Sequence, residues 1–369
     1  MLQNIRDRFT GVFAIVLLVL LAVFGLAGTG CDGLLDVRTP DTIAANTVNP
    51  IEDAPAFSQS AWQNYADFLS QHAVYTAWFT NEMRVGDTFP TRNAFGRRFI
   101  DDRNSDLDSE WEDLSRAVAS AEDALVLLAE LGDADINITR LYLTTAFASL
   151  NMAEAFCTGV IREGPDAPSP ELTRAEMLAH AIERFEQAIA SAAAVGSDAD
   201  DMADAARVGL ARANLYAGNN AAAATAAASV ADDFVYNAEY IDDPGNRGRL
   251  GNTVWAYSGA TATRESGVVG PEWRALGQGN DISTDQPFAG EEAGDPRVMW
   301  EYDGRTAQDG VHEYVFQRTL DGWDAPIPVA SGLEARYIEL QAAGTDIERV
   351  AFINERRAVG GQGVFAGSG

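Results

Sequence analysis

Apolar residues recur every three or four positions through much of the chain between residues 53 and 232, which is the spacing of one face of an α-helix. The clearest stripe follows Ser109, which forms an expected capping box with Glu112. Its members are Trp111, Leu114, Val118, Ala121, Leu125 and Leu128. The same spacing predicts a helix that opens at Asp53 and runs towards Phe79. This part of the chain is therefore expected to be helical.

Further helices are predicted over 138–157, 202–217 and 221–231, and from the capping-box residue Thr173 onwards. Residues 210–230 (LARANLYAGNNAAAATAAASV) resemble the middle of a tetratricopeptide repeat, with a helix, a Gly-Asn turn and an alanine-faced helix. The 34-residue period of that repeat is not clean elsewhere. The predicted fold class is mainly α, with an irregular tetratricopeptide-like scaffold over 53–232.

The pattern changes between residues 233 and 329. Glycine, proline and aspartate become frequent there, aromatic residues cluster, and only short alternating stretches such as 312–317 predict strands. Helical spacing returns over 330–369, starting from Ser331 with Glu334. We therefore expect a loop-rich insertion with a few short strands, followed by C-terminal helices.

The N-terminus has the pattern of an export signal. Arg6 and Arg8 precede an apolar run over 11–27, and small residues lead directly to Cys31. This favours a lipoprotein leader over 1–30, a lipidated Cys31 and an extended tether over 31–52. An uncleaved membrane helix is the alternative, because the apolar run is just long enough for one. With Cys31 acylated, Cys157 has no partner and is expected to pack as a small apolar residue.

Charge and composition exclude several classes of function. The chain of 369 residues carries 55 acidic and 26 basic side chains, a net charge of −29, which would repel nucleic acid. Its few cysteines and histidines show no spacing typical of a zinc site, and no cofactor is predicted. The alternating polar run Asp102, Asn104, Asp106 and Asp108 is similar to a calcium loop but has Leu107 where the turn glycine belongs. We interpret it as helix-capping and solvated residues.

Several segments, taken together and in order, resemble the SusD/RagB family of outer-membrane nutrient-binding lipoproteins. They are CDGLLDVRTPDT at 31–42, AWFTNEMRVGDT at 77–88, LYLTTAFASLNMAEAFCTGV at 141–160, GLARANLYAGNNAAA at 209–223, the DPR tripeptide at 295–297, IPVASGLEARYIELQAAG at 327–344 and INERRAVGG at 353–361. Members of that family usually continue well beyond the last segment, so a shortened C-terminal region or a fragment is expected here.

The resemblance implies a lipoprotein on the outer face of the outer membrane. Its partners would be a SusC-like TonB-dependent barrel and an oligosaccharide or similar nutrient, and it would not be an enzyme. Consistently, no acidic pair lies in an apolar setting that would mark a glycosidase. The alternative is a periplasm-facing repeat lipoprotein that scaffolds protein partners.

Candidate ligand contacts come from the loops, because a sugar-binding surface needs aromatic faces and a few polar partners held on a rigid scaffold. In the insertion they are Trp255, Tyr257, Trp273, Arg264 and Glu272, and after the first helix they are Phe89, Arg92 and Asn93. The sequence does not show whether the two loops meet. Packing inside the loop-rich region is the competing interpretation of these aromatics, and it fits Trp300 and Trp323 better.

Overall fold

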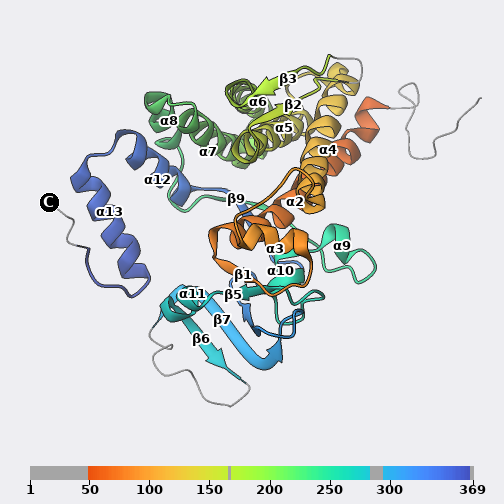
Figure 1. The fold of residues 1–369 in the computed structure, drawn as a ribbon. Coiled ribbons are helices and arrows are strands. Elements are labelled where there is room, and N and C mark those ends of the chain that lie inside the picture. The colour runs from red at the N-terminus through yellow and green to blue at the C-terminus, as the bar shows by residue number, and fades with distance from the viewer. Residues whose placement is uncertain (1–48, 165–167, 283–293, 366–369) are drawn as a thin grey trace, which may run out of the picture. The chain divides into compact units, whose positions relative to one another are not determined.

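The computed structural model describes residues 49–164, 168–282 and 294–365 (Figure 1). Helices dominate, as predicted. The longer ones are α2 (Pro50–Thr80), α4 (Ser105–Leu127), α5 (Ile136–Ala155), α6 (Arg174–Val195), α7 (Asp200–Tyr216), α12 (Gly332–Ala343) and α13 (Asp346–Val359). The shorter ones are α3 (Pro90–Gly96), α8 (Asn220–Ala227), α9 (Arg247–Leu250), α10 (Thr253–Ser258), α11 (Pro271–Leu276) and the 3-10 turns at Ala129–Leu131 and Ser197–Ala199.

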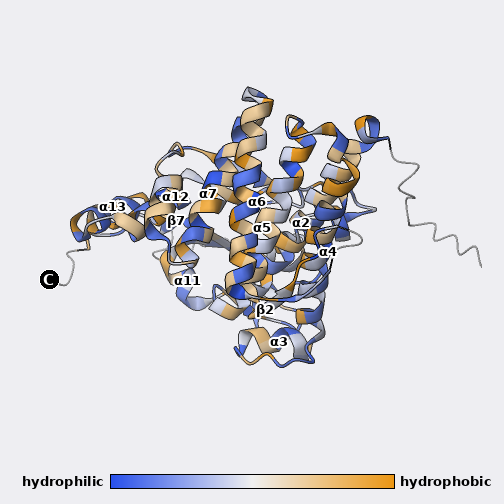
Figure 2. Cartoon of the chain, turned by 90° about the horizontal axis from the view of Figure 1, so that it is seen from above, coloured by the Kyte–Doolittle hydropathy of each residue, from blue (hydrophilic) through white to orange (hydrophobic). Residues whose placement is uncertain are grey.

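Consecutive helices of the scaffold pack side by side, as in a helical repeat protein: α4 on α2, α5 on α4, α6 on α5, α7 on α6 and α8 on α7. Hydrophobic and hydrophilic residues alternate along α5, α6 and α7 (Figure 2). The interface between α6 and α7 is especially close, since a Cβ at Gly209 would lie 2.2 Å from the ring of Phe185. Small residues on one helix thus make room for an aromatic ring on the next.

Local hydrogen bonds, more than apolar spacing, set where the helices begin. The first helix begins at Pro50 and not at the predicted Asp53, because the Asn49 side chain accepts from the backbone N–H of Ile51. The Asp53 carboxylate accepts from the backbone N–H of Asn49 at 2.8 Å, so Asp53 completes this start from inside the helix. The first helix therefore begins before the predicted Asp53.

The predicted capping boxes differ in outcome. Thr173 and Glu176 form one at the start of α6, and Ser331 caps α12 by accepting from the N–H of Glu334. The box at Ser109 is wrong, because Asn104 caps α4 by accepting from two backbone N–H groups. The Ser109 hydroxyl lies one turn inside that helix and donates to the carbonyl of Ser105.

The strands are short and lie mostly in the insertion. They are β1 (Met83–Val85), β2 (Thr158–Val160), β3 (Glu171–Thr173), β4 (Val235–Ala238), β5 (Gly267–Val269), β6 (Gly277–Asp281), β7 (Asp295–Thr306), β8 (Glu313–Gln317) and β9 (Ile327–Ser331). Strand β7 is paired with β6 in parallel and with β8 in antiparallel orientation. The alternating stretch predicted at 312–317 is confirmed as β8.

Two antiparallel pairs connect the insertion to the scaffold. Strand β4 pairs with β9 at the base of the insertion, so the chain leaves the helices and returns to them at the same place. Helix α12 then packs on α8 and α7 and continues the helical stack. Strand β1, which follows α2, pairs with β5 in the middle of the insertion. This second pair determines which loops become neighbours.

The predicted anchor Cys31 lies outside the described residues. Of the helices that the structure describes, none is both long and apolar enough to cross a bilayer. Cys157 is exposed and free among the described residues, so its predicted packing in the core is wrong. It follows the last turn of α5, where the chain leaves the helix stack.

Candidate ligand-binding site

The two loops that carry the candidate residues meet. Pairing of Arg84 in β1 with Val268 in β5 places the turn after β1 beside the segment that precedes β5. As a result the guanidinium of Arg92 lies 5.3 Å from the ring centroid of Tyr257, and the guanidinium of Arg264 lies at the same distance from that ring. Residues separated by more than 160 positions thereby form one cluster.

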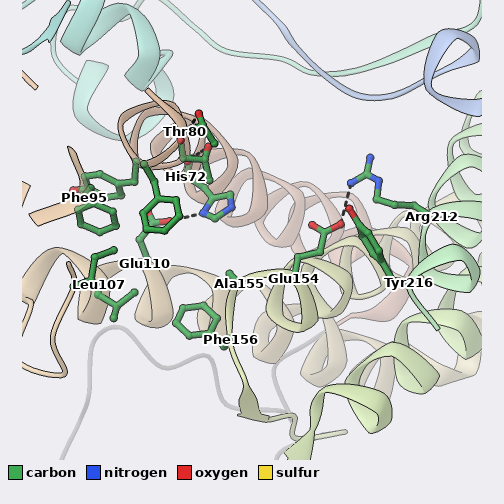
Figure 3. A pocket seen from close by; sticks show the side chains of 14 residues that line it. His72, Thr80, Phe95, Leu107, Glu110, Glu154, Ala155, Phe156, Arg212 and Tyr216 are labelled. Carbon is green, nitrogen blue, oxygen red and sulfur yellow. Dashed lines mark hydrogen bonds and ion pairs between the residues drawn. The ribbon is translucent and has the colours of Figure 1, made fainter. Parts of the chain in front are cut away.

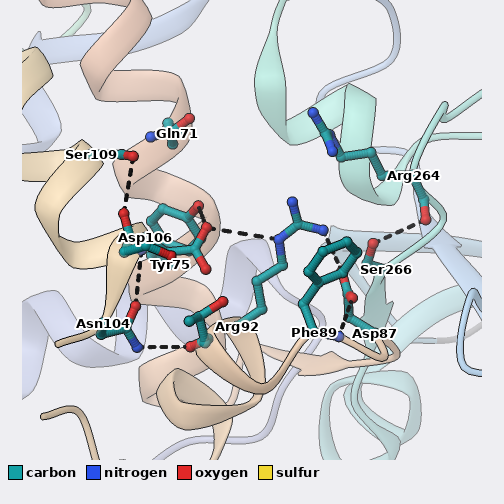
Figure 4. Close-up of polar contacts among 12 residues, drawn as sticks. Gln71, Tyr75, Asp87, Phe89, Arg92, Asn104, Asp106, Ser109, Arg264 and Ser266 are labelled. Atoms are coloured by element: carbon teal, nitrogen blue, oxygen red, sulfur yellow. Dashed lines mark hydrogen bonds and ion pairs between the residues drawn. The ribbon is translucent and has the colours of Figure 1, made fainter.

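Arg92 stabilises the loop after β1 through a buried ion pair with Asp87. Its side chain is buried and donates to Asp87 Oδ2 at 2.7 Å, while its Nε lies 3.9 Å from a carboxylate oxygen of Asp106 (Figure 4). Burial alone would lower the pKa of Arg92, but the hydrogen bond and the charge of Asp87 outweigh it and hold this pKa above its usual value. The Asp87 carboxylate also accepts from the N–H of Phe89. This buried ion pair therefore shapes the turn.

Phe89 and Arg264 form the accessible part of the cluster. The Phe89 ring is 50% exposed and is backed by the Arg92 guanidinium at 4.5 Å from its centroid. Arg264 is exposed, and its guanidinium has no hydrogen bond or ion pair among the described residues beyond its contact with the Tyr257 ring. The amide of Asn93 is engaged, since it donates to the carbonyls of Asp87 and Phe89. The half-exposed ring of Phe89 can stack with a polar ring, and the guanidinium of Arg264 can donate hydrogen bonds to one.

Trp255 and Tyr257 do not offer faces to a ligand, which corrects the prediction for both. They lie on α10 with 5% and 4% of their surface exposed. The indole N–H of Trp255 donates to Thr261, and the ring of Tyr257 meets Trp78 edge-on at 5.4 Å. The competing interpretation holds for them: aromatics fill the core of a region poor in aliphatic residues. Trp300 and Trp323 are buried as predicted.

Trp273 and Glu272 lie on α11, on the other side of the β1–β5 pair. The indole of Trp273 is half-buried and donates to the carbonyl of Asn81, and the exposed Glu272 carboxylate lies 3.3 Å from Arg84. Trp273 lines a small cavity of about 330 Å³ with Arg297 and Met299. No contact joins these two residues to Phe89 or Arg264 among the described side chains, so the predicted set divides into two groups.

The acidic run before α4 has structural partners. Asn104 caps the helix, and Asp106 accepts from the hydroxyl of Tyr75 at 2.8 Å. Within residues 49–164, 168–282 and 294–365, no three His, Cys, Asp or Glu side chains come together as metal ligands would. The interpretation of this run as helix-capping residues therefore describes Asn104 correctly.

The scaffold contains a larger cavity that the sequence reasoning missed. It has a volume of about 590 Å³ and lies between α2, α4, the end of α5 and the end of α7 (Figure 3). Aromatic and aliphatic side chains form most of its wall: Tyr75, Phe79, Phe95, Ile100, Leu107, Ala155, Phe156 and Tyr216. Polar groups lie at two places, His72 with Glu110 and Glu154 with Arg212 (Figure 3).

Carboxylates dominate the charge of this cavity. Burial raises the pKa of Glu110, against the hydrogen bond that Oε2 forms with His72 Nδ1 at 2.8 Å. Burial likewise raises the pKa of Glu154, with Arg212 acting against it. Arg212 is already engaged, because its Nε donates to Glu334 at 2.6 Å. The positive charge in the wall thus has a carboxylate partner outside the cavity.

One of the residues in this wall, Glu110, has a signal in the sequence. Glu110 stands three residues after Leu107 and four before Leu114, so it occupies the core-facing stripe of α4. A carboxylate in such a stripe is unusual, since acidic side chains are rarely fully buried without a partner. That signal shows a buried acid but not a cavity, because the other walls come from distant helices.

The class of protein is defined by this architecture: a stack of helical repeats carrying a loop-rich insertion, closed at its base by a strand pair. No protein-family model matches the chain, and no curated protein matches it in sequence. Solved structures match the chain in fold. A SusD-like carbohydrate binding protein from Bacteroides vulgatus ATCC 8482 is similar with a TM-score of 0.59 and 14% identity, over 86% of this chain and 76% of that one.

Two SusD superfamily proteins from the same organism are also similar. One has a TM-score of 0.58 and 13% identity over 86% of this chain and 82% of its own, and the other a TM-score of 0.53 and 14% identity over 84% and 80%. The chain therefore has the SusD-like fold, and the resemblance read from its sequence segments is confirmed at the level of the fold.

Proposed function

We propose that this protein is a nutrient-binding lipoprotein that holds an oligosaccharide on the loop surface formed by Phe89 and Arg264. It is a binding protein and not an enzyme. Lipid on Cys31 anchors it to the outer membrane, where it faces the cell exterior and passes the ligand to a SusC-like TonB-dependent barrel for uptake. The similar fold of a carbohydrate binding protein supports the ligand class.

The observation that carries the proposal is the meeting of two distant loops at the buried ring of Tyr257, next to which Arg92 backs the exposed ring of Phe89. Phe89 is half exposed although a buried ion pair, Arg92 with Asp87, holds its turn in place. An apolar ring that is held rigidly at the surface can stack with a pyranose without a large loss of side-chain freedom on binding. Arg264, which contacts the same Tyr257 ring as Arg92, can donate to sugar hydroxyls.

Glycan binding by the lipidated full chain tests the site. A glycan array identifies a ligand, and calorimetry then compares variants. We expect Phe89→Ala and Arg264→Ala each to weaken binding by about tenfold, since anchors of a binding surface typically contribute more than about 1 kcal/mol. Phe99→Ala and Arg103→Ala are matched controls, because both side chains are exposed and lie outside the cluster. Equal effects of all four changes would contradict the site.

Partnership and location need a separate experiment. Gentle solubilisation of the tagged lipoprotein and mass spectrometry of what copurifies should recover a TonB-dependent barrel in stoichiometric amount. Protease added to intact cells should cleave the protein if it faces outward. Recovery of periplasmic assembly factors, with protection from protease, would favour the alternative of a periplasmic scaffold.

A further inference from the structure

The cavity in the helical scaffold is separate from the loop surface and has its own chemistry. Its volume of about 590 Å³ lies in the range of small-molecule sites, and its wall is mostly apolar. Two of its aromatic side chains, Phe79 and Tyr216, are 44% and 45% exposed. Apolar rings of this size left partly open to solvent offer contact area to a ligand with an apolar body.

Glu110 is the unusual group in this wall. Only 3% of the residue is exposed, and its Oε2 is bonded to His72. Its other oxygen, Oε1, is buried and accepts no hydrogen bond from any side chain or backbone group in the part of the chain that the structure describes. The amide of Gln71 donates to Asp113 at 3.4 Å and also lies close enough to the Glu110 carboxylate to act against the rise in its pKa. A buried acceptor without a donor is costly, so it marks a place where a donor is missing.

The charges around the cavity indicate what kind of donor fits. Glu154 adds a second carboxylate to the wall, and the one guanidinium there, Arg212, lies 3.9 Å from Glu154 but 2.6 Å from Glu334. The wall thus holds two carboxylates, one guanidinium and the imidazole of His72, in a protein that is acidic throughout. The partly exposed aromatic face of Phe79 attracts cations as well. The complementary ligand is a cation that carries N–H donors and an apolar body.

We propose that the scaffold cavity is a second binding site, which takes a small organic ammonium ion through Glu110 and the aromatic wall. The ammonium group donates to Oε1 of Glu110, and the apolar body of the ligand packs against Phe79 and Phe156. Neither Phe89 nor Arg264 lines this cavity, and its ligand need not be the transported nutrient.

Tryptamine, an aromatic amine, is the probe, and tryptophol is its neutral counterpart with a hydroxyl in place of the ammonium group. Calorimetry on the full chain should show saturable binding of tryptamine and binding of tryptophol that is weaker by about tenfold or more, because the charge-assisted hydrogen bond is lost. Equal affinity for the two compounds, or no saturable binding of tryptamine, would overturn the proposal.

Variants locate the binding. Glu110→Gln should remove the preference for the amine, whereas Glu112→Gln, which alters an exposed acid of the same helix, should leave it unchanged. An equal loss in both would overturn the site. If Glu110→Gln fails to fold, Ala155→Trp replaces it: Ala155 is exposed and lines the cavity, so a large side chain there fills the space without disturbing the core. Retained tryptamine binding in a folded Ala155→Trp protein would contradict the proposal.

Discussion

The helical scaffold and the insertion both enclose apolar cores, but they differ in how distant segments of the chain are joined. In the scaffold, small side chains let helices approach and aromatic rings fill the space, as where Phe185 lies against Gly209 and meets Phe147 edge-on at 4.9 Å. In the insertion, segments far apart in the chain are joined by polar contacts. Asn252, for example, caps α10 and donates to the carbonyl of Ala325 at 2.7 Å, and Tyr314 donates to the carbonyl of Gly259.

Because of this difference, we expect the scaffold to determine mainly the stability of the protein, and the insertion to determine mainly its ligand contacts. Apolar burial is non-directional and adds up over many side chains, and most residues of the larger apolar core come from the scaffold helices. Directional hydrogen bonds and ion pairs fix the geometry of individual loops, so the insertion and the turn at Phe89 determine where ligand contacts point. Damage to the scaffold should therefore unfold the protein, and damage to the insertion should loosen a loop.

The largest effect is expected for Phe185→Ala in the scaffold. The side chain is fully buried, and its removal leaves a cavity between α5, α6 and α7, so the free energy of unfolding should fall by about 3–5 kcal/mol. Urea denaturation followed by circular dichroism measures it. Phe99→Ala, at a position 75% exposed, should change this free energy by less than about 0.5 kcal/mol. A loss below about 1 kcal/mol for Phe185→Ala would mean that packing does not hold the scaffold.

A smaller and local effect is expected for Asn252→Ala in the insertion. The change removes the cap of α10 and leaves the partly buried carbonyl of Ala325 without its donor, which together cost about 2 kcal/mol. Hydrogen exchange should speed up in α10 and change little in α5 and α6. Asn219→Ala is the control, because Asn219 precedes α8 without capping it through its side chain. Uniform acceleration across the protein would show that the two regions unfold as one unit.

The smallest effect concerns Asp67 in the scaffold, whose pKa is raised from 3.8 to about 6. Burial is the main cause and Asp113 adds to it, while Arg249 and Arg116 act against it. Because the folded protein holds this proton more tightly than the unfolded chain, Asp67 destabilises the fold increasingly as pH rises from about 4 to 6. Asp67→Asn should therefore raise the free energy of unfolding at pH 8 by about 1–2 kcal/mol and have little effect at pH 4. A gain that is the same at both pH values would rule out this titration.

Sequence periodicity was a sound guide to the scaffold. The stripe that starts at Trp111 lies on α4, and the capping pair of Thr173 and Glu176 marks the start of α6, because both depend on residues within a few positions of one another. The errors at Asp53 and Ser109 arose where a second capping residue, Asn49 or Asn104, stood a turn earlier. Several polar residues near a helix start can each act as a cap. In α2 and α4 the earlier residue accepts from the free backbone N–H groups and so fixes the start of the helix.

The candidate site was harder to predict. Phe89, Arg92 and Arg264 do belong together, but their meeting depends on the pairing of β1 with β5, which neither short strand shows alone. Trp255 and Tyr257 were misassigned to the surface because Gly-rich sequence without periodicity does not reveal which side chains become buried. Glu110 was visible as an acid in an apolar stripe, yet its cavity needs walls from other helices.

Sequence alone determined the helical class, most helix positions, the region of the insertion and the resemblance to SusD-like proteins. These features follow from contacts within a turn or two of helix and from the order of segments along the chain. Only the tertiary structure decided which aromatics face solvent, that Arg92 and Arg264 share the ring of Tyr257, and that a cavity opens beside Glu110. Burial and long-range proximity are properties of the packed chain, since each depends on residues that the local pattern does not contain.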